Sequence, residues 1–320
     1  MSPRRLIGMR VLFAGTPAVA LPTLQAILNS DHDVVGVLTR PPARAGRKRA
    51  LLASPVQEFA EEVGLPVITS DRPHQPDTVA AIRELAPEVA AVVAYGGLVR
   101  EPALSLPERG WINLHFSLLP AWRGAAPVQH AIRAGDQITG ATTFWIEAGL
   151  DTGPVLGTLT EQIRARDTSG DLLERLAEAG GPLMVATLDA VADGTADAQP
   201  QPATGISHAP RLTTAQAQLD WSQPAFAVDR SIRAFTPAPG PWTMLAGGRV
   251  KIGPVQPLSQ GPQLAPGEIL AEPQHVLVGT GTTPVRLGQL AQAGKGWMAA
   301  ADWARGARPA PGTRFEWGTS

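Results

Sequence analysis

The residues best suited to chemistry are an amide, an imidazole and a carboxylate in segments bounded by glycine and proline. Asn113 and His115 open the stretch Asn-Leu-His-Phe-Ser-Leu-Leu-Pro-Ala-Trp-Arg-Gly (113–124), and Asp151 lies in Gly-Leu-Asp-Thr-Gly (149–153). Residues two apart on an extended segment point to the same face, so Asn113 and His115 should face one site. We expect Asn113 to hold a developing oxyanion, His115 to move a proton, and Asp151 to orient the imidazole and stabilise its charged form.

The residue types also favour direct group transfer over a covalent intermediate. The chain has no cysteine, and no serine lies in a Gly-x-Ser-x-Gly turn, so the usual nucleophiles of an acyl-enzyme are missing. Disulfides and thiolate metal sites are excluded for the same reason. The turn 15–17 (Gly-Thr-Pro) is not Gly-x-Gly-x-x-Gly, which argues against a nicotinamide oxidoreductase.

The stretch from Asn113 onward, with the later aspartate, resembles the pattern Asn-x-His-x-Ser-Leu-Leu-Pro of the formyltransferases that use 10-formyltetrahydrofolate. Within that superfamily the sequence most resembles the methionyl-tRNA formyltransferases. The resemblance covers nearly the whole chain, in the family's order and spacing. The further stretches that carry it are 13–17, 92–96, 123–129, 149–153, 220–222 and 233–235.

The resemblance implies an activity and a set of binding residues. The formyl group of 10-formyltetrahydrofolate, the co-substrate, would pass to the amino group of methionyl-initiator tRNA, with no metal required. The loop that would receive the folate is Ser117, Leu118, Leu119 and Pro120, although a plain core-facing loop is the alternative reading. The sequence departs from the family pattern at Phe116, where a small residue is usual, and at Ala121, where a basic residue is common.

Basic residues suggest where a large RNA substrate would bind. The resemblance implies that the loop 40–49 helps hold the acceptor end of the tRNA, and its binding candidates are Arg44, Arg47, Lys48 and Arg49. The whole chain has a net charge of −1, but residues 214–320 carry nine Arg and Lys against six Asp and Glu. A weakly basic second domain could follow a phosphate backbone, and an ordinary solvated surface explains the charge equally well.

The first half of the chain alternates between apolar strands and helices. Strands are expected at 9–15, 33–39, near Val67 and at 89–94, and helices at 18–29, from Ser54 as N-cap, and at 77–85. This alternation predicts an open, Rossmann-like α/β domain with a parallel sheet and its site at the carboxyl ends of the strands. A further helix is expected over 168–193, broken or kinked at Gly-Gly-Pro (180–182).

Composition divides the chain into a catalytic domain (1–194), a linker (195–213) and a C-terminal domain (214–320). The linker is polar and rich in Pro and Gly. After a helix at 225–235, short strands are expected at 250–252, 267–271, 275–279 and 283–287, which suggests a small β-barrel. The resemblance implies an OB-like barrel that binds tRNA.

No apolar run of the sequence is long enough to span a bilayer, and we expect no signal peptide. We expect a cytoplasmic protein. We also expect it to be a monomer. Other readings are a glycinamide-ribonucleotide or sugar-nucleotide formyltransferase, and a non-enzymatic RNA-binding module that keeps a degenerate α/β domain. The intact set of Asn113, His115 and Asp151 argues against the last of these.

Overall fold

The computed structural model describes residues 8–45 and 50–318 and separates into two compact units. Unit 1 comprises Met1–Pro127, Ile138–Gln162 and Leu173–Pro210, and unit 2 comprises Val128–Gln137, Ile163–Leu172 and Arg211–Ser320. The predicted divisions at residues 194 and 214 stay a prediction, because the chain contributes to each unit more than once. No helix of the described ranges is long and apolar enough to cross a membrane.

Unit 1 is built on a seven-stranded sheet whose order is β5-β2-β1-β6-β7-β8-β9. The parallel strands are β5 (Val67–Thr69), β2 (Asp33–Thr39), β1 (Arg10–Gly15), β6 (Val89–Val93) and β7 (Trp111–His115). Two antiparallel strands, β8 (Ile138–Trp145) and β9 (Val155–Gln162), extend the sheet beyond β7. The Rossmann-like α/β fold is thus confirmed, with an antiparallel edge added to the parallel sheet.

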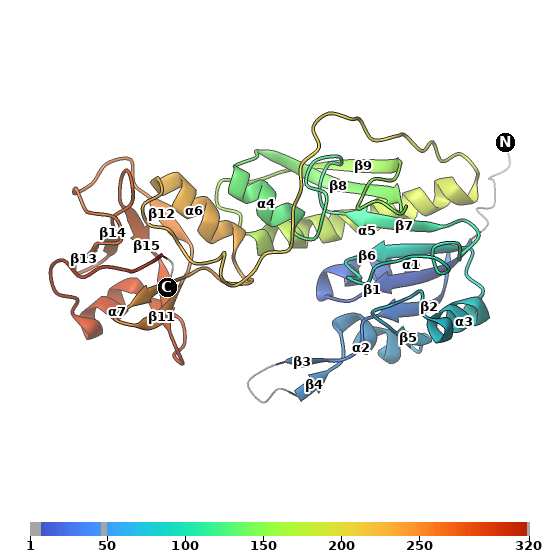
Figure 1. Cartoon of the computed structure of the whole chain (residues 1–320), viewed down its shortest axis with the longest axis horizontal. Helices are drawn as coiled ribbons and strands as arrows, with labels where there is room; N and C mark the ends of the chain where they lie inside the picture. Colours follow the sequence, from blue (N-terminus) through green and yellow to red (C-terminus); the bar gives the residue numbers. More distant parts are fainter. Residues whose placement is uncertain (1–7, 46–49, 319–320) are drawn as a thin grey trace. The chain divides into compact units, whose positions relative to one another are not determined.

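Continuous apolar sequence explains why the central strands are buried on both faces. All five residues of β6 are buried, and helices pack beside the sheet, with α1 (Leu21–Leu28) against β2 and α3 (Pro76–Leu85) against β5 (Figure 1). A short 3-10 turn, η1 (Ala18–Ala20), precedes α1. The predicted N-cap of α2 (Pro55–Glu62) is confirmed, because the Ser54 side chain accepts a hydrogen bond from the Gln57 backbone N–H at 3.0 Å.

Helix α5 (Ser169–Ala192) corrects one expectation, since it runs unbroken through 180–182 with Pro182 inside it. A break at this point is therefore wrong, and the alternative, a kink, stays a prediction. A Cβ on Gly180 would lie 2.6 Å from the Leu114 side chain, and one on Gly181 would lie 3.1 Å from the Pro22 carbonyl oxygen. These glycines let the helix backbone approach β7 and α1 closely, and tertiary packing outweighs their low helix propensity.

The predicted basic loop, 40–49, contains a short strand, β3 (Ala43–Ala45), that pairs antiparallel with β4 (Ala50–Leu52). Figure 1 shows this ribbon extending away from the seven-stranded sheet. Arg47, Lys48 and Arg49 lie outside the described residues, and of Arg44 only the backbone, in β3, is described. Their role in tRNA binding stays a prediction.

Unit 2 contains two four-stranded antiparallel sheets. The first sheet has the order β10 (Trp242–Leu245), β11 (Gly248–Ile252), β16 (Gln289–Gln292) and β17 (Met298–Ala299). The second has the order β12 (Val255–Pro257), β15 (Val285–Leu287), β14 (Val276–Val278) and β13 (Ile269–Ala271). The helices of this unit include α6 (Ala225–Ala234) and α7 (Ala300–Ala307), and α4 (Pro127–Ala134) lies almost entirely within it.

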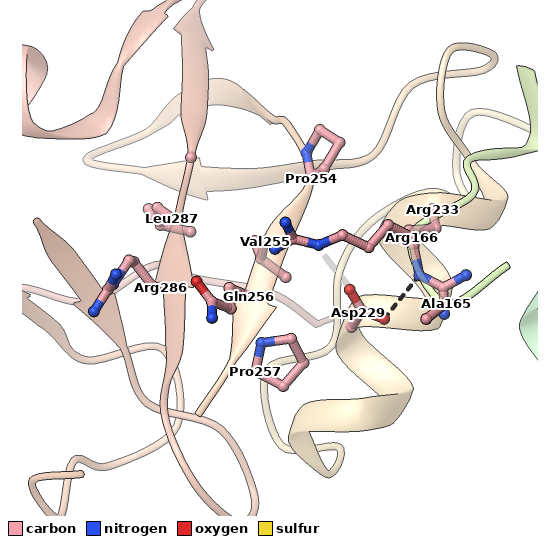
Figure 2. Close-up of a pocket in the computed structure, with 11 residues that line it drawn as sticks. Ala165, Arg166, Asp229, Arg233, Pro254, Val255, Gln256, Pro257, Arg286 and Leu287 are labelled. Atoms are coloured by element: carbon pink, nitrogen blue, oxygen red, sulfur yellow. Dashed lines mark hydrogen bonds and ion pairs between the residues drawn. The ribbon is translucent and has the colours of Figure 1, made fainter. Parts of the chain in front are cut away.

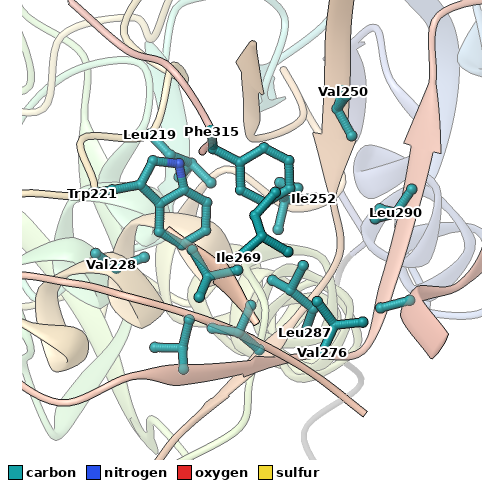
Figure 3. Close-up of a cluster of buried hydrophobic side chains, with 14 of the residues drawn as sticks. Leu219, Trp221, Val228, Val250, Ile252, Ile269, Val276, Leu287, Leu290 and Phe315 are labelled. Atoms are coloured by element: carbon teal, nitrogen blue, oxygen red, sulfur yellow. The ribbon is translucent and has the colours of Figure 1, made fainter. Parts of the chain in front are cut away.

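Both sheets of unit 2 share one hydrophobic core, as expected of a barrel-like domain. Figure 3 shows Trp221 beside Phe315 in this core, and their ring centroids lie 5.5 Å apart in a stacked arrangement. The buried Trp221 indole N–H donates to the Thr243 hydroxyl at 3.0 Å, so its polar atom is satisfied. The predicted C-terminal β-domain is confirmed, although the sequence did not reveal β10, β12, β16, β17 and α7.

Candidate active site

His115 is the last residue of β7, at the carboxyl end of a strand inside the sheet, and only 6% of its surface is exposed. Its Nε2 lies 2.9 Å from the Trp122 carbonyl oxygen. A carbonyl oxygen can only accept, so Nε2 carries the hydrogen of the neutral ring. The unprotonated Nδ1 then faces the Asp151 carboxylate, whose Oδ2 lies 3.8 Å away. His115 thus presents a lone pair beside a negative charge.

The environment of His115 acts on its pKa in opposing directions. Burial lowers the pKa of His115, whereas the Asp151 charge and the hydrogen bond to the Trp122 carbonyl raise it, and the net effect is a pKa below the ordinary value of 6.5. The imidazole is therefore neutral at neutral pH and can accept a proton. Asp151 stabilises the imidazolium that results.

Asp151 lies in the loop between β8 and β9, in a left-handed backbone conformation with φ of 50°. Its Oδ2 accepts a hydrogen bond from the Gly124 backbone N–H at 2.7 Å. The 3.8 Å to His115 is too long for a hydrogen bond. In this structure the Trp122 carbonyl orients the imidazole, and Asp151 contributes charge.

Asn113 lies two residues before His115 on β7, so both side chains lie on one face of the sheet. The Asn113 side chain is half-buried, and its amide makes no hydrogen bond within the part of the chain that the structure describes. An amide with free donors at this edge is suited to bind an oxyanion. That role stays a prediction.

The predicted folate loop packs closely against β8. Ser117 is fully buried, and its hydroxyl donates to the Ala121 carbonyl at 2.6 Å. Thr142 on β8 donates to the Ser117 carbonyl at 2.7 Å and accepts from the Leu119 backbone N–H at 3.2 Å. Leu119 is buried, while Leu118 and Pro120 are half-buried. The Ser117 hydroxyl and the Leu119 N–H are thus already bonded, and the contact of this loop with folate stays a prediction.

Two residues that the sequence did not point to come from the predicted linker. Gln201 donates hydrogen bonds to the carbonyl oxygens of Asp151 and Gly153, both at 2.8 Å. Ser207 accepts a hydrogen bond from the Trp122 backbone N–H at 2.8 Å. Nothing in the composition of the linker marks these side chains, because their partners are distant in sequence.

Unit 2 carries a groove of about 860 Å³ between α6, the segment at 165–166 and the strands β12 and β15. Arg233 in its wall pairs with Asp229 at 2.8 Å, whereas Arg166 and Arg286 form no ion pair with any described residue. Figure 2 shows the Arg166 side chain extending toward β12. Arg286 lies opposite Gln256 in the pairing of β15 with β12. The groove therefore has a net positive charge.

Comparisons with known proteins show the family of the chain. Residues 9–188 match the family model for formyl transferase, and residues 211–308 match that for the formyl transferase C-terminal domain. The methionyl-tRNA formyltransferase of Salinispora arenicola is 59% identical over 300 residues, covering 94% of this chain and 97% of the relative. That of Thermobifida fusca is 57% identical, covering 96% of this chain and 99% of the relative.

Solved structures share the fold at lower identity. HypX from Aquifex aeolicus aligns with a TM-score of 0.65 at 18% identity, covering 93% of this chain and 48% of that one. The N-formyltransferase from Helicobacter canadensis aligns with a TM-score of 0.66 at 17% identity, covering 87% of this chain and 98% of that one. From the family models and the near full-length relatives together, the chain belongs to the formyl transferase family, on its methionyl-tRNA formyltransferase branch.

Proposed function

We propose that this protein transfers the formyl group of 10-formyltetrahydrofolate to the amino group of methionyl-initiator tRNA. The observation that carries the proposal is His115, buried and neutral beside Asp151, in a chain 59% identical to a methionyl-tRNA formyltransferase. Membership of the formyl transferase family supports a folate-derived donor, and a HypX structure that shares the fold was solved with tetrahydrofolic acid. We place the activity in the cytoplasm, in a monomer.

In the proposed reaction the methionyl nitrogen attacks the formyl carbon, and negative charge gathers on the formyl oxygen. Asn113 donates to that oxygen. The nitrogen must lose a proton, and Nδ1 of His115 accepts it, because Nε2 is already bonded to the Trp122 carbonyl. When the C–N bond to the folate breaks, His115 returns a proton to the departing N10. The formyl group arrives already activated on nitrogen, so the proposed steps call for no metal.

Two basic regions, in different parts of the chain, are candidates for binding the tRNA. Arg47, Lys48 and Arg49 follow β3 in the sequence and lie outside the described residues, so their part rests on the sequence alone. In unit 2, Arg166 and Arg286 line the groove without an ion-pair partner among the described residues. Guanidinium groups bind phosphate through paired hydrogen bonds. We therefore propose that the groove binds backbone phosphates of the tRNA.

The groove is tested by Arg166→Ala and Arg286→Ala, with Arg305→Ala as a matched control. Arg305 is exposed on α7 and pairs with Asp302, and it does not line the groove. Each groove variant should raise KM for methionyl-tRNA and lessen the slope of log(kcat/KM) against log[salt] by about 0.9 per lost phosphate contact. An equal effect of Arg305→Ala would show that net charge, not the groove, matters.

The activity itself is tested with charged initiator tRNA. The protein, 10-formyltetrahydrofolate and methionyl-tRNA should yield formylmethionyl-tRNA and tetrahydrofolate in equal amounts. Glycinamide ribonucleotide offered in place of the tRNA serves as the control substrate. Transfer to glycinamide ribonucleotide but not to methionyl-tRNA would overturn the proposed function.

A further inference from the structure

We propose that Gln201 is a positioning residue of the transfer reaction: it holds the Asp151 loop so that the carboxylate faces His115. This inference rests on the proposed function, because it assigns a role within that site. Gln201 lies in the segment that composition predicts to be a flexible linker. In the structure its side chain is half-buried and fully hydrogen-bonded.

Every polar atom of the Gln201 side chain is used. Its Nε2 donates to the carbonyl oxygens of Asp151 and Gly153, both at 2.8 Å. Its Oε1 accepts from Arg123, from Nε at 3.1 Å and from Nη2 at 2.6 Å. Carbonyl oxygens only accept and a guanidinium only donates, so these partners allow a single orientation of the amide. Gln201 thus joins the Asp151 loop to Arg123.

The hydrogen bonds of Gln201 fix an uncommon backbone conformation in the Asp151 loop. Asp151 has a φ of 50°, in the left-handed region that few residues other than glycine, Asn and Asp adopt. The Gln201 amide bonds the carbonyl of Asp151 and that of Gly153, two residues later. Losing these bonds would free the loop to relax and would move the carboxylate away from Nδ1 of His115.

The same linker segment also supports the partner of His115. Trp122, whose carbonyl accepts from His115, is itself left-handed with φ of 61°, and its N–H donates to Ser207. The Arg123 backbone N–H donates to the Ser207 carbonyl at 2.9 Å, and its carbonyl accepts from the Ala209 N–H at 2.7 Å. Both groups that act on the imidazole, the Trp122 carbonyl and the Asp151 carboxylate, are thus held from the segment 201–209.

The pKa of His115 reports the position of the Asp151 carboxylate. Asp151 is the charge that raises the pKa of His115, and Arg123 is the basic residue that donates to Gln201. Gln201 does not touch His115, so its removal would act on the imidazole indirectly, chiefly by moving Asp151. A residue that only stabilised the fold would leave the pKa of His115 in the folded protein unchanged.

The test compares Gln201→Ala and Gln201→Glu with Gln199→Ala in the full-length protein. Gln199 is a matched control, since it is the same residue type two positions earlier, its side chain is exposed, and it makes no side-chain hydrogen bond within the described residues. Gln201→Glu still accepts from Arg123 but cannot donate to the Asp151 and Gly153 carbonyls. This variant separates support of the catalytic loop from simple pairing with Arg123.

Gln201→Ala and Gln201→Glu should each lower kcat about 10- to 100-fold, the cost of misplacing a catalytic group by about 1 Å. KM for both substrates should stay within about twofold of the wild-type value, because the polar atoms of the Gln201 side chain are already bonded to Asp151, Gly153 and Arg123. Nuclear magnetic resonance titration should show a lower pKa of His115 in Gln201→Ala, as Asp151 moves away. Gln199→Ala should match the wild-type protein in each measurement.

Two results would overturn the inference: wild-type kcat in Gln201→Glu, or an unchanged pKa of His115 in folded Gln201→Ala. If Gln201→Ala does not fold, Gln201→Met keeps the volume of the side chain and takes its place in the titration. The titration needs no substrate. A wild-type protein that formylates no methionyl-tRNA would refute the proposed function, while the titration would still decide whether Gln201 positions Asp151.

Discussion

Replacing Asp151 by asparagine removes the negative charge that faces His115 while keeping the size of the side chain. The Asn side-chain oxygen can still accept the Gly124 N–H, which Asp151 Oδ2 accepts at 2.7 Å. The main change is therefore electrostatic. We expect a lower pKa of His115, because the raising effect of Asp151 is lost and the lowering effect of burial remains.

The distance between the charges sets the magnitude. At the 3.8 Å that separates His115 Nδ1 from Asp151 Oδ2, two unit charges attract by about 1 kcal/mol in bulk water and about 4 kcal/mol at an effective dielectric constant near 20. The pKa of His115 should therefore fall in Asp151→Asn, and kcat should fall by about 10- to 1,000-fold, since about 1.4 kcal/mol corresponds to a tenfold change in rate.

The assay is a histidine titration followed by nuclear magnetic resonance, combined with a pH–rate profile. The chain has six histidines, and the resonance that disappears in His115→Asn is that of His115. Activity requires neutral His115, so the rate falls as pH drops through its pKa. In Asp151→Asn this acid limb should lie at lower pH, and the plateau should also be lower.

Glu147→Gln is the control, because it removes the same charge from an exposed position in the same β8–β9 connection. It should leave both the pKa of His115 and kcat near the wild-type values. An identical pKa of His115 in the wild-type protein and Asp151→Asn would refute the electrostatic role of Asp151. A shifted pKa with an unchanged kcat would refute His115 as the group that takes the proton.

The other predictions concern the oxyanion donor, the strained loop and the second core. Asn113→Ala should lower kcat by about 100- to 1,000-fold without changing the circular dichroism spectrum, and wild-type turnover would reduce Asn113 to a structural residue. Gly124→Ala, at φ 126° and with its Cβ 2.6 Å from the Ala209 carbonyl oxygen, should destabilise the fold by about 1–3 kcal/mol in urea. The loss should exceed that of Gly194→Ala, which also has a positive φ, of 68°, but whose Cβ meets nothing within 4 Å. Trp221→Ala should cost about 3–5 kcal/mol by the same method, and a loss under about 1 kcal/mol would contradict the core described for unit 2.

Local sequence determined much of the first unit. Three apolar runs, each about the length of a single strand, predicted β1, β2 and β6. Ser-Pro at 54–55 predicted the start of α2. These features depend on neighbouring residues, so they can be read without the fold. The spacing of Asn113 and His115 likewise placed both on one face of a strand, because side chains alternate along any strand.

Contacts between residues far apart in sequence were decided only by the tertiary structure. The unbroken course of α5 through Gly180 depends on close packing against Leu114, which outweighs local propensity. The two short strands β12 and β17 gain their hydrogen bonds from β15 and β16, so their own few residues carry little signal.

The chemistry of the site divides in the same way. The sequence identifies Asn113, His115 and Asp151 as candidates for chemistry. Which ring nitrogen of His115 carries the proton is determined only by its contact with the Trp122 carbonyl. Gln201, 50 residues from Asp151, reaches it only because the chain folds back. Residue type and local spacing are properties of the sequence, whereas hydrogen-bond partners and electrostatic environment exist only once distant segments are brought together.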